Sequence, residues 1–252
     1  MKKSIIYFLL FLIFSNISIS QNLNNKKVLV VWGGWEGHKP KLFAGHVENW
    51  LISQKADYKI SNGLEAYDDY DELIKYDLII QSVTMGKISK KQEENLVKAV
   101  LNGVGIAGAH GGLVDSFRKN TNYQFMIGGQ FVAHPGGMIE HKVIMLDDEL
   151  TQGLSDFEIV SEQYYMHYDP NVKIIAEAKF GGEVYPWIKD VVMPVAWKKM
   201  YGKGKVFFIS IGHNPDEFMI YDNGWKLLTR GFAWATRSVS YTHLRAHETR
   251  NY

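Results

Sequence analysis

The sequence contains no cysteine, and this absence excludes several kinds of chemistry. Without thiols the chain can form no disulfide, no thiolate metal site and no cysteine nucleophile. The formal net charge is only +1, and lysine and arginine form no basic stripe. Nucleic acid is therefore not an expected partner. The chain also lacks a heptad pattern and internal repeats, which argues against a purely structural module.

A long apolar run occurs only at the N-terminus, where the sequence is typical of a secretory signal peptide. Two lysines are followed by an apolar stretch over 5–14 and by small residues before Gln21. We expect residues 1–20 to be a signal peptide, 21–26 a short linker, and the mature protein to be periplasmic or extracellular. Because the apolar stretch is too short to span a bilayer comfortably, we expect no stable membrane insertion after cleavage.

The first half of the chain alternates short apolar runs with amphipathic segments. Such alternation predicts a βαβ array, with a mostly parallel sheet and helices on both faces. The predicted strands cover 27–32, 77–81 and 104–109, and the predicted helices cover 41–54 and the segment from Ser89 to Gly103.

The second half is richer in strands. Extended segments are predicted at 141–146, 157–168 and 172–178, a β-hairpin at 193–210, and a final helix at 222–235. Residues 27–235 are therefore expected to form one α/β domain.

The last segment, 236–252, is polar and aperiodic, unlike the sequence before it. It is similar to translated adapter sequence at the end of a truncated gene, and we expect a disordered, non-native tail. His243 and His247 are excluded from the functional argument for this reason.

Glycines surround His110 in the segment 103–112. Four of the six residues from Gly103 to Gly108 carry at most one methyl group, so another part of the chain must pack closely against this strand. The turn after a central strand of an α/β sheet often displays a reactive side chain, and here that side chain is an imidazole. The alternative is a histidine that only satisfies hydrogen bonds in a tight turn.

Five short motifs follow one another in a recognisable order. They are a glycine-rich loop with His38, the segment 103–111, Gly128–Gly136 with His134, Ser161–Tyr164, and Pro194–His213 with Trp197. Together they resemble the ThuA-like (trehalose utilisation) family over residues 27–235. The resemblance implies a flavodoxin-like sheet of the class I glutamine amidotransferase type and a link with sugar metabolism. Ser161 stands where the family usually has aspartate.

Amidotransferase activity does not follow from the resemblance, because that reaction needs a cysteine thiolate. Catalysis must instead use acid–base groups, a metal, or both. We expect His110 and Glu162 to exchange protons with substrate, tyrosines near Glu162 to raise its pKa, and Asp115 to orient His110. The alternatives are a Glu162 carboxylate paired with lysine and an Asp115 that caps a helix.

Further residues are candidates for binding a sugar. An indole beside an imidazole in the first loop suits ring stacking and hydroxyl binding, whereas the alternative is packing in the core. The candidates are Trp35, His38, His134, Tyr164, Trp197 and His213.

A divalent metal ion is a candidate cofactor. His110, His134 and His213 lie after predicted strands or in loops, and such strand ends converge at one edge of a parallel sheet. Three imidazoles, or two with Glu162, suit a zinc-like site with an open position. Alternatively, these histidines hydrogen-bond sugar hydroxyls or the main chain.

The sequence therefore predicts an exported enzyme that processes a small carbohydrate. The expected reaction is hydrolysis or elimination on a disaccharide, glycoside or keto-sugar, and a homo-oligomer is a candidate assembly. The alternative is a non-catalytic sugar-binding or accessory domain of the same fold.

Overall fold

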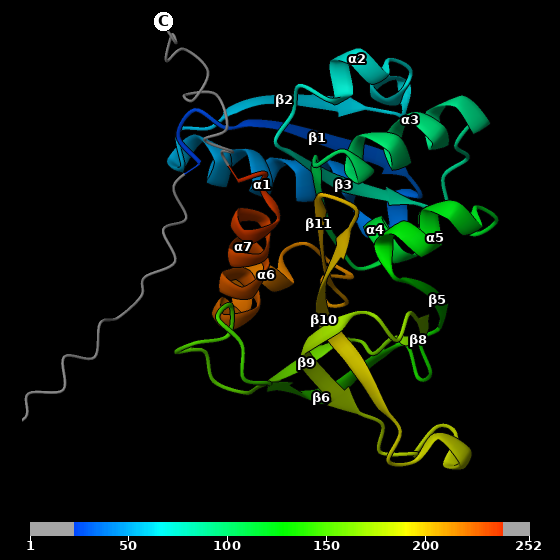
Figure 1. Ribbon diagram of the computed structural model, residues 1–252. Coiled ribbons are helices and arrows are strands. Elements are labelled where there is room, and N and C mark those ends of the chain that lie inside the picture. Colours follow the sequence, from blue (N-terminus) through cyan, green and yellow to red (C-terminus); the bar gives the residue numbers. More distant parts are fainter. Residues whose placement is uncertain (1–22, 239–252) are drawn as a thin grey trace, which may run out of the picture.

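The computed structural model describes residues 23–238, which fold around a nine-stranded sheet (Figure 1). A two-stranded sheet of β5 (Gly129–Ala133) and β8 (Tyr165–Tyr168) lies apart from it. The nine strands are, in spatial order, β2 (Asp57–Asn62), β1 (Lys27–Gly34), β3 (Leu78–Thr84), β4 (Gly105–Ala109), β11 (Gly204–Ile209), β10 (Val192–Tyr201), β9 (Lys173–Lys179), β6 (Met138–Met145) and β7 (Phe157–Glu162).

The sheet is mixed, with a parallel half and an antiparallel half that meet at β11. The strands β2, β1, β3, β4 and β11 pair in parallel, in the spatial order of flavodoxin-like sheets. The remaining neighbours, from β11 through β10, β9 and β6 to β7, are antiparallel. The prediction of a mostly parallel sheet is correct for the half that ends at β11 and wrong for the other half, whose antiparallel strands need no crossover helix between them.

Helices cover both faces of the parallel half, as predicted (Figure 1). Val28 and Val30 of β1 pack on the face covered by α1 (Pro40–Ser53) and α7 (Asp222–Ala235). Leu29 and Val31 face the opposite way, toward α3 (Lys90–Leu101), α4 (Gly111–Val114) and α5 (Thr121–Ile127). This alternation of buried side chains explains the continuous apolar run in β1. The shorter helices are η1 (Glu36–His38), η2 (Glu65–Tyr67), α2 (Tyr70–Leu73), η3 (Pro186–Ile188) and α6 (Glu217–Ile220).

The ends of the described chain are tied to the domain. Leu23, in the segment predicted to be a linker, is buried in the core. Arg237, in the predicted tail, donates from Nε to the carbonyl of Gly103 at 3.0 Å. The predicted signal peptide and the tail beyond residue 238 lie outside the described residues. Within residues 23–238, no helix has the length and apolarity needed to cross a bilayer.

Candidate active site

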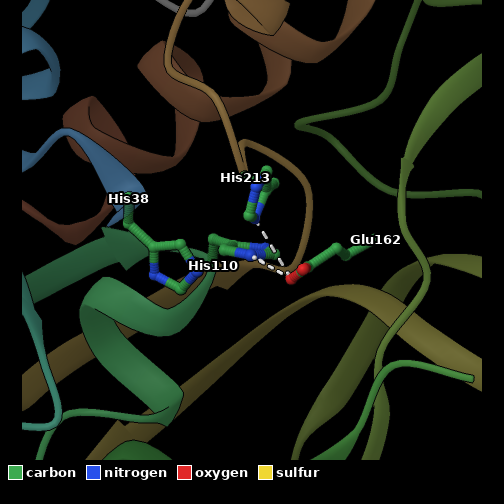
Figure 2. A group of neighbouring side chains, drawn as sticks. All are labelled: His38, His110, Glu162 and His213. Carbon is green, nitrogen blue, oxygen red and sulfur yellow. Dashed lines mark hydrogen bonds and ion pairs between the residues drawn. The ribbon is translucent and has the colours of Figure 1, made fainter. Parts of the chain in front are cut away.

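Four side chains from distant segments converge beyond the carboxyl ends of the strands (Figure 2). His38 ends η1 after β1, His110 precedes α4 after β4, and His213 follows β11. Glu162 ends β7, in the antiparallel half. One nitrogen or oxygen from each residue lies within 4.8 Å of the corresponding atoms of the other three. The carboxyl ends of parallel strands thus gather the imidazoles as expected.

The turn at His110 is strained and closely packed. Its φ of 52° and ψ of −145° are unusual for a residue with a side chain, and such conformations cost on the order of 1–3 kcal/mol. The His110 amide donates to the carbonyl of Ile209 at 2.7 Å. A Cβ on the following Gly111 would lie 2.7 Å from Cε1 of His38, so only glycine lets the two histidines approach.

The hydrogen bonds of His110 fix its tautomer. Nδ1 lies 2.6 Å from the carbonyl oxygen of Ser210. A carbonyl can only accept, so Nδ1 carries a proton. Nε2 lies 3.1 Å from Oε2 of Glu162. In the neutral ring Nε2 has only a lone pair, so either a second proton or a metal cation is needed between this nitrogen and the carboxylate.

Glu162 is buried among imidazoles that favour its charged form. Its Oε2 lies 3.2 Å from Nδ1 of His213, and its Oε1 lies 3.7 Å from Nε2 of His134. Burial opposes ionisation, but the contacts with His110 and His213 outweigh it and hold the pKa of Glu162 well below its usual range. The same contact with Glu162 raises the pKa of His213. The expectation that desolvation raises the pKa of Glu162 is therefore wrong.

His38 is held as a neutral imidazole. Burial, and then repulsion by His110 and His213, lower the pKa of His38 to about 3. Its Nδ1 lies 2.9 Å from Oγ1 of Thr84, which holds the ring in place from the end of β3. A neutral, anchored imidazole is the form that binds metal ions.

Three more of the predicted residues line this cluster. The ring of Trp35 is 47% exposed and meets His38 edge to face, with 4.7 Å between ring centroids. The side chain of His134 is 43% exposed, at the rim beside Glu162. Tyr164 is buried, and its ring centroid lies 4.1 Å from that of His110. Trp35 and His134 are thus accessible to a ligand, whereas Tyr164 supports the His110 ring.

Two predicted site residues have other contacts. Asp115 accepts from Nε and Nη2 of Arg118, at 2.5 and 2.7 Å, and makes no hydrogen bond with His110. The backbone carbonyl of Ser210 orients His110 instead. Trp197 is fully buried and donates from Nε1 to the carbonyl of Ile127 at 3.0 Å. It is a core residue with no exposed surface for a sugar.

Glu217 is not among the predicted site residues, although it hydrogen-bonds the segments that carry His213 and Glu162. This buried carboxylate accepts from Oγ of Ser161 at 2.7 Å and from the amides of Gly212 and Asn214 at 3.1 and 3.0 Å. It therefore links the loop on both sides of His213 to the residue before Glu162. An acidic residue at the start of a short helix gives no sequence signal for this role.

Comparisons with known proteins agree with this architecture. The family model for ThuA, described as trehalose utilisation, matches residues 27–235. A ThuA-like protein from Bacteroides uniformis has a TM-score of 0.70 and 18% identity, covering 84% of this chain and 91% of that one. A ThuA-like protein from Parabacteroides merdae has a TM-score of 0.64 and 15% identity, covering 84% and 90%.

A cytoplasmic protein from Salmonella typhimurium LT2 is also similar, with a TM-score of 0.60 and 14% identity over 84% of this chain and all of that one. Among curated proteins no relative matches significantly. At these low identities the structural matches establish the fold alone.

Proposed function

Because the chain belongs to the ThuA (trehalose utilisation) family, we propose that it is a carbohydrate-processing enzyme that holds a divalent metal ion at His38, His110, His213 and Glu162. The proposed reaction is hydrolysis or elimination on a disaccharide, glycoside or keto-sugar. The family match supports the link with carbohydrate. The observation that supports the site is the convergence of the four side chains from separate segments, with donor atoms within 4.8 Å of one another.

The donor set fits a metal ion of the zinc or first-row transition type. Three imidazoles and one carboxylate are ligands that such ions prefer. His110 is already oriented for this role, since its Nδ1 proton is donated to Ser210 and its Nε2 faces Glu162. A carbonyl partner of this kind commonly fixes a metal-binding histidine. When bound, a divalent metal supplies Lewis-acid polarisation of a substrate oxygen or a lowered pKa for water.

The residues around the cluster have separable roles in this proposal. The exposed indole of Trp35 offers a flat surface against which a sugar ring packs. His134, half-exposed and 3.7 Å from Oε1 of Glu162, is placed to give or take a proton at the rim. Tyr164 closes the inner side of the cluster and limits the access of water to His110.

Metal binding and turnover test the proposal directly. We expect the purified, chelator-treated protein to bind one equivalent of Zn²⁺, Mn²⁺, Co²⁺ or Ni²⁺ in calorimetry. We also expect the loaded protein to act on a member of a panel of trehalose, other disaccharides, glycosides and 3-keto-glycosides. A protein that binds none of these metals and leaves the whole panel unchanged contradicts the proposal.

The alternative is a non-catalytic sugar-binding or accessory domain, which the missing cysteine nucleophile also allows. The two functions differ in their dependence on His110. Tight sugar binding without turnover, unaffected by His110→Ala, is the result expected of a binding domain.

Export also remains part of the proposal, on the evidence of the N-terminal sequence alone. N-terminal sequencing of the protein recovered from cell fractions tests it. We expect a mature chain that starts near Gln21, outside the cytoplasm.

A further inference from the structure

A cavity of about 400 Å³ lies beside the candidate active site. Two loops form it, one after β3 and the other between α4 and α5. Its volume falls within the range of small-molecule sites, which is about 300–1,000 Å³. The residues that line it are Met85, Gly86, Lys87, Ile88, Arg118, Lys119 and Asn120.

The cavity is connected to the histidine cluster along its first loop. Thr84, which contacts Nδ1 of His38, directly precedes Met85 in this wall. Met85 has a positive φ of 51°, and its amide donates to the carbonyl of Asp115 at 2.8 Å. A methionine is held in this unfavourable conformation only where the surrounding structure requires it. Because Thr84 and Met85 are consecutive, the first loop joins the cavity to the histidine cluster.

A second connection runs through aromatic rings. The guanidinium of Arg118 lies 5.7 Å from the ring centroid of Phe131. Phe131 stacks in turn on His134, with ring centroids 5.7 Å apart, and contacts Tyr164 at 4.6 Å. Arg118, which lines the cavity, is thus linked through Phe131 to His134 at the rim of the cluster.

The charged side chains that line the cavity are all positive. Lys87, Arg118 and Lys119 line it, and no carboxylate does. Asp115 occupies Nε and Nη2 of Arg118, which leaves Nη1 without a hydrogen bond among the described residues. Neither lysine has a hydrogen bond or an ion pair within residues 23–238. Arg118 is thus partly compensated by Asp115, whereas the two unpaired lysines give the cavity an excess of positive charge that attracts an anion.

We propose that this cavity is a subsite for an anionic group, a carboxylate or a phosphate, on the carbohydrate that reacts at the neighbouring cluster. The inference rests on the proposed function and narrows it, because the substrate class becomes an acidic sugar. Arg118 is held rigidly by Asp115 and presents a fixed donor, while the two lysines supply charge. Met85 and Ile88 supply apolar contacts for the carbon skeleton.

Calorimetric titration with glucose, glucuronate and glucose 6-phosphate tests the subsite. We expect at least one acidic sugar to bind wild-type protein about tenfold or more tightly than glucose, with the preference reduced at high salt. The stronger of the two acidic ligands identifies carboxylate or phosphate as the preferred group. The double variant Lys87→Gln/Lys119→Gln should lose most of the preference, since of the three cations only Arg118 remains, while Lys90→Gln should keep it. Lys90 is a matched control because its side chain is exposed at the start of α3 and, among the described residues, pairs with Glu94 away from the cavity lining.

Two outcomes overturn the subsite. One is equal affinity of the wild-type protein for all three sugars. The other is an acidic-sugar preference that is undiminished in the double variant. Metal titration of the same samples separates this inference from the proposed function. If the protein binds metal and turns over neutral sugars but shows no preference for acidic sugars, only the subsite is contradicted. If it prefers acidic sugars but binds no metal and turns over no sugar, only the proposed function is contradicted.

Discussion

The carbonyl oxygen of Ser210 lies 2.6 Å from Nδ1 of His110 and decides which nitrogen of that ring carries the proton. The two residues follow β11 and β4, which are adjacent and parallel in the sheet. The orientation of the ring is therefore set by the backbone of a neighbouring strand and does not depend on a mobile side chain. This leaves Nε2 of His110 directed at Glu162.

Replacing His110 by alanine should abolish the metal site. We expect His110→Ala to lower the affinity for Zn²⁺ by about 100-fold or more, because it removes the ligand whose orientation is fixed best. Competition with a chromogenic chelator measures the change. His46→Ala serves as the control, since this histidine hydrogen-bonds Asp216 at 3.0 Å and is not among the clustered ligands. Equal affinities of the wild type and His110→Ala would exclude His110 as a ligand.

Glu217 should act as a positioning residue for His213. Glu217→Ala leaves the amides of Gly212 and Asn214 without acceptors, which costs on the order of 1–3 kcal/mol for each buried group. We expect weaker metal binding and an altered visible spectrum of the Co²⁺-loaded protein, with partial recovery in Glu217→Gln. Asp216→Ala, at the adjacent and more exposed acid, is the control. A lower melting temperature with an unchanged Co²⁺ spectrum would reduce Glu217 to a purely structural role.

Metal affinity should rise with pH. The pKa of His213 is raised by Glu162, so protons compete with the metal for this ring until the pH exceeds that value. In the metal-free protein, protonated His213 stabilises the fold below its unfolded pKa, and this contribution is lost as the pH rises through the folded pKa. The pKa of Glu162 is lowered, so its contribution is present above its unfolded pKa and is lost on acidification.

We expect Zn²⁺ affinity to increase between about pH 5 and about pH 8, the range in which histidines titrate. NMR titration of the His213 ring in the presence of chelator should give a pKa above that of a free imidazole. His213→Gln should flatten the pH dependence of the affinity. A flat profile in the wild type would contradict this prediction.

Two glycine-to-alanine substitutions should differ in outcome: one should weaken metal binding, and the other should stabilise the fold. Gly111→Ala places a Cβ 2.7 Å from Cε1 of His38, so we expect a displaced His38 ring and weaker metal binding. Gly45→Ala lies inside α1 with no neighbouring atom within 4 Å, and should stabilise the fold by about 0.5–1 kcal/mol. Chemical denaturation and metal titration measure both variants. Unchanged metal affinity in Gly111→Ala would show that the site can adjust to the added methyl group.

Trp197 should matter for stability alone. Trp197→Phe removes the indole donor from the carbonyl of Ile127 and leaves a smaller side chain in a fully buried position. We expect a loss of about 1–3 kcal/mol in the free energy of unfolding, with metal and sugar binding unchanged. Trp35→Phe is the comparison at the exposed rim. A specific loss of sugar affinity in Trp197→Phe would restore its predicted role in binding.

The elements with strong local signals could be predicted from the sequence. The capping box formed by Ser89 and Gln92 is present at the start of α3, and the predicted final helix has the observed bounds. The hairpin of β10 and β11 turns between Tyr201 and Gly204, as predicted. The weakly apolar strand β2 was not predicted, because its position is fixed by pairing with β1 and not by its own pattern.

The sequence predicted which histidines belong to the site, but it did not predict the contacts that support them. The glycines around His110 pointed to a close approach, which the packing of Gly111 against His38 now explains. No pattern in the sequence distinguishes Asp115 from a backbone carbonyl as the partner of His110. It also could not show that the imidazoles outweigh the effect of burial on Glu162. Both depend on distances between segments that are remote in the chain.

The change from parallel to antiparallel pairing at β11 places the site across a structural boundary. The three imidazoles belong to the parallel half, whereas Glu162 is supplied by the antiparallel half. The distance between the negative charge and the three rings therefore depends on how the two halves pack against each other. A cation bound between the halves would hold them together, so we expect proteolysis of β6 and β7 to be slower in the metal-loaded protein than in the metal-free protein.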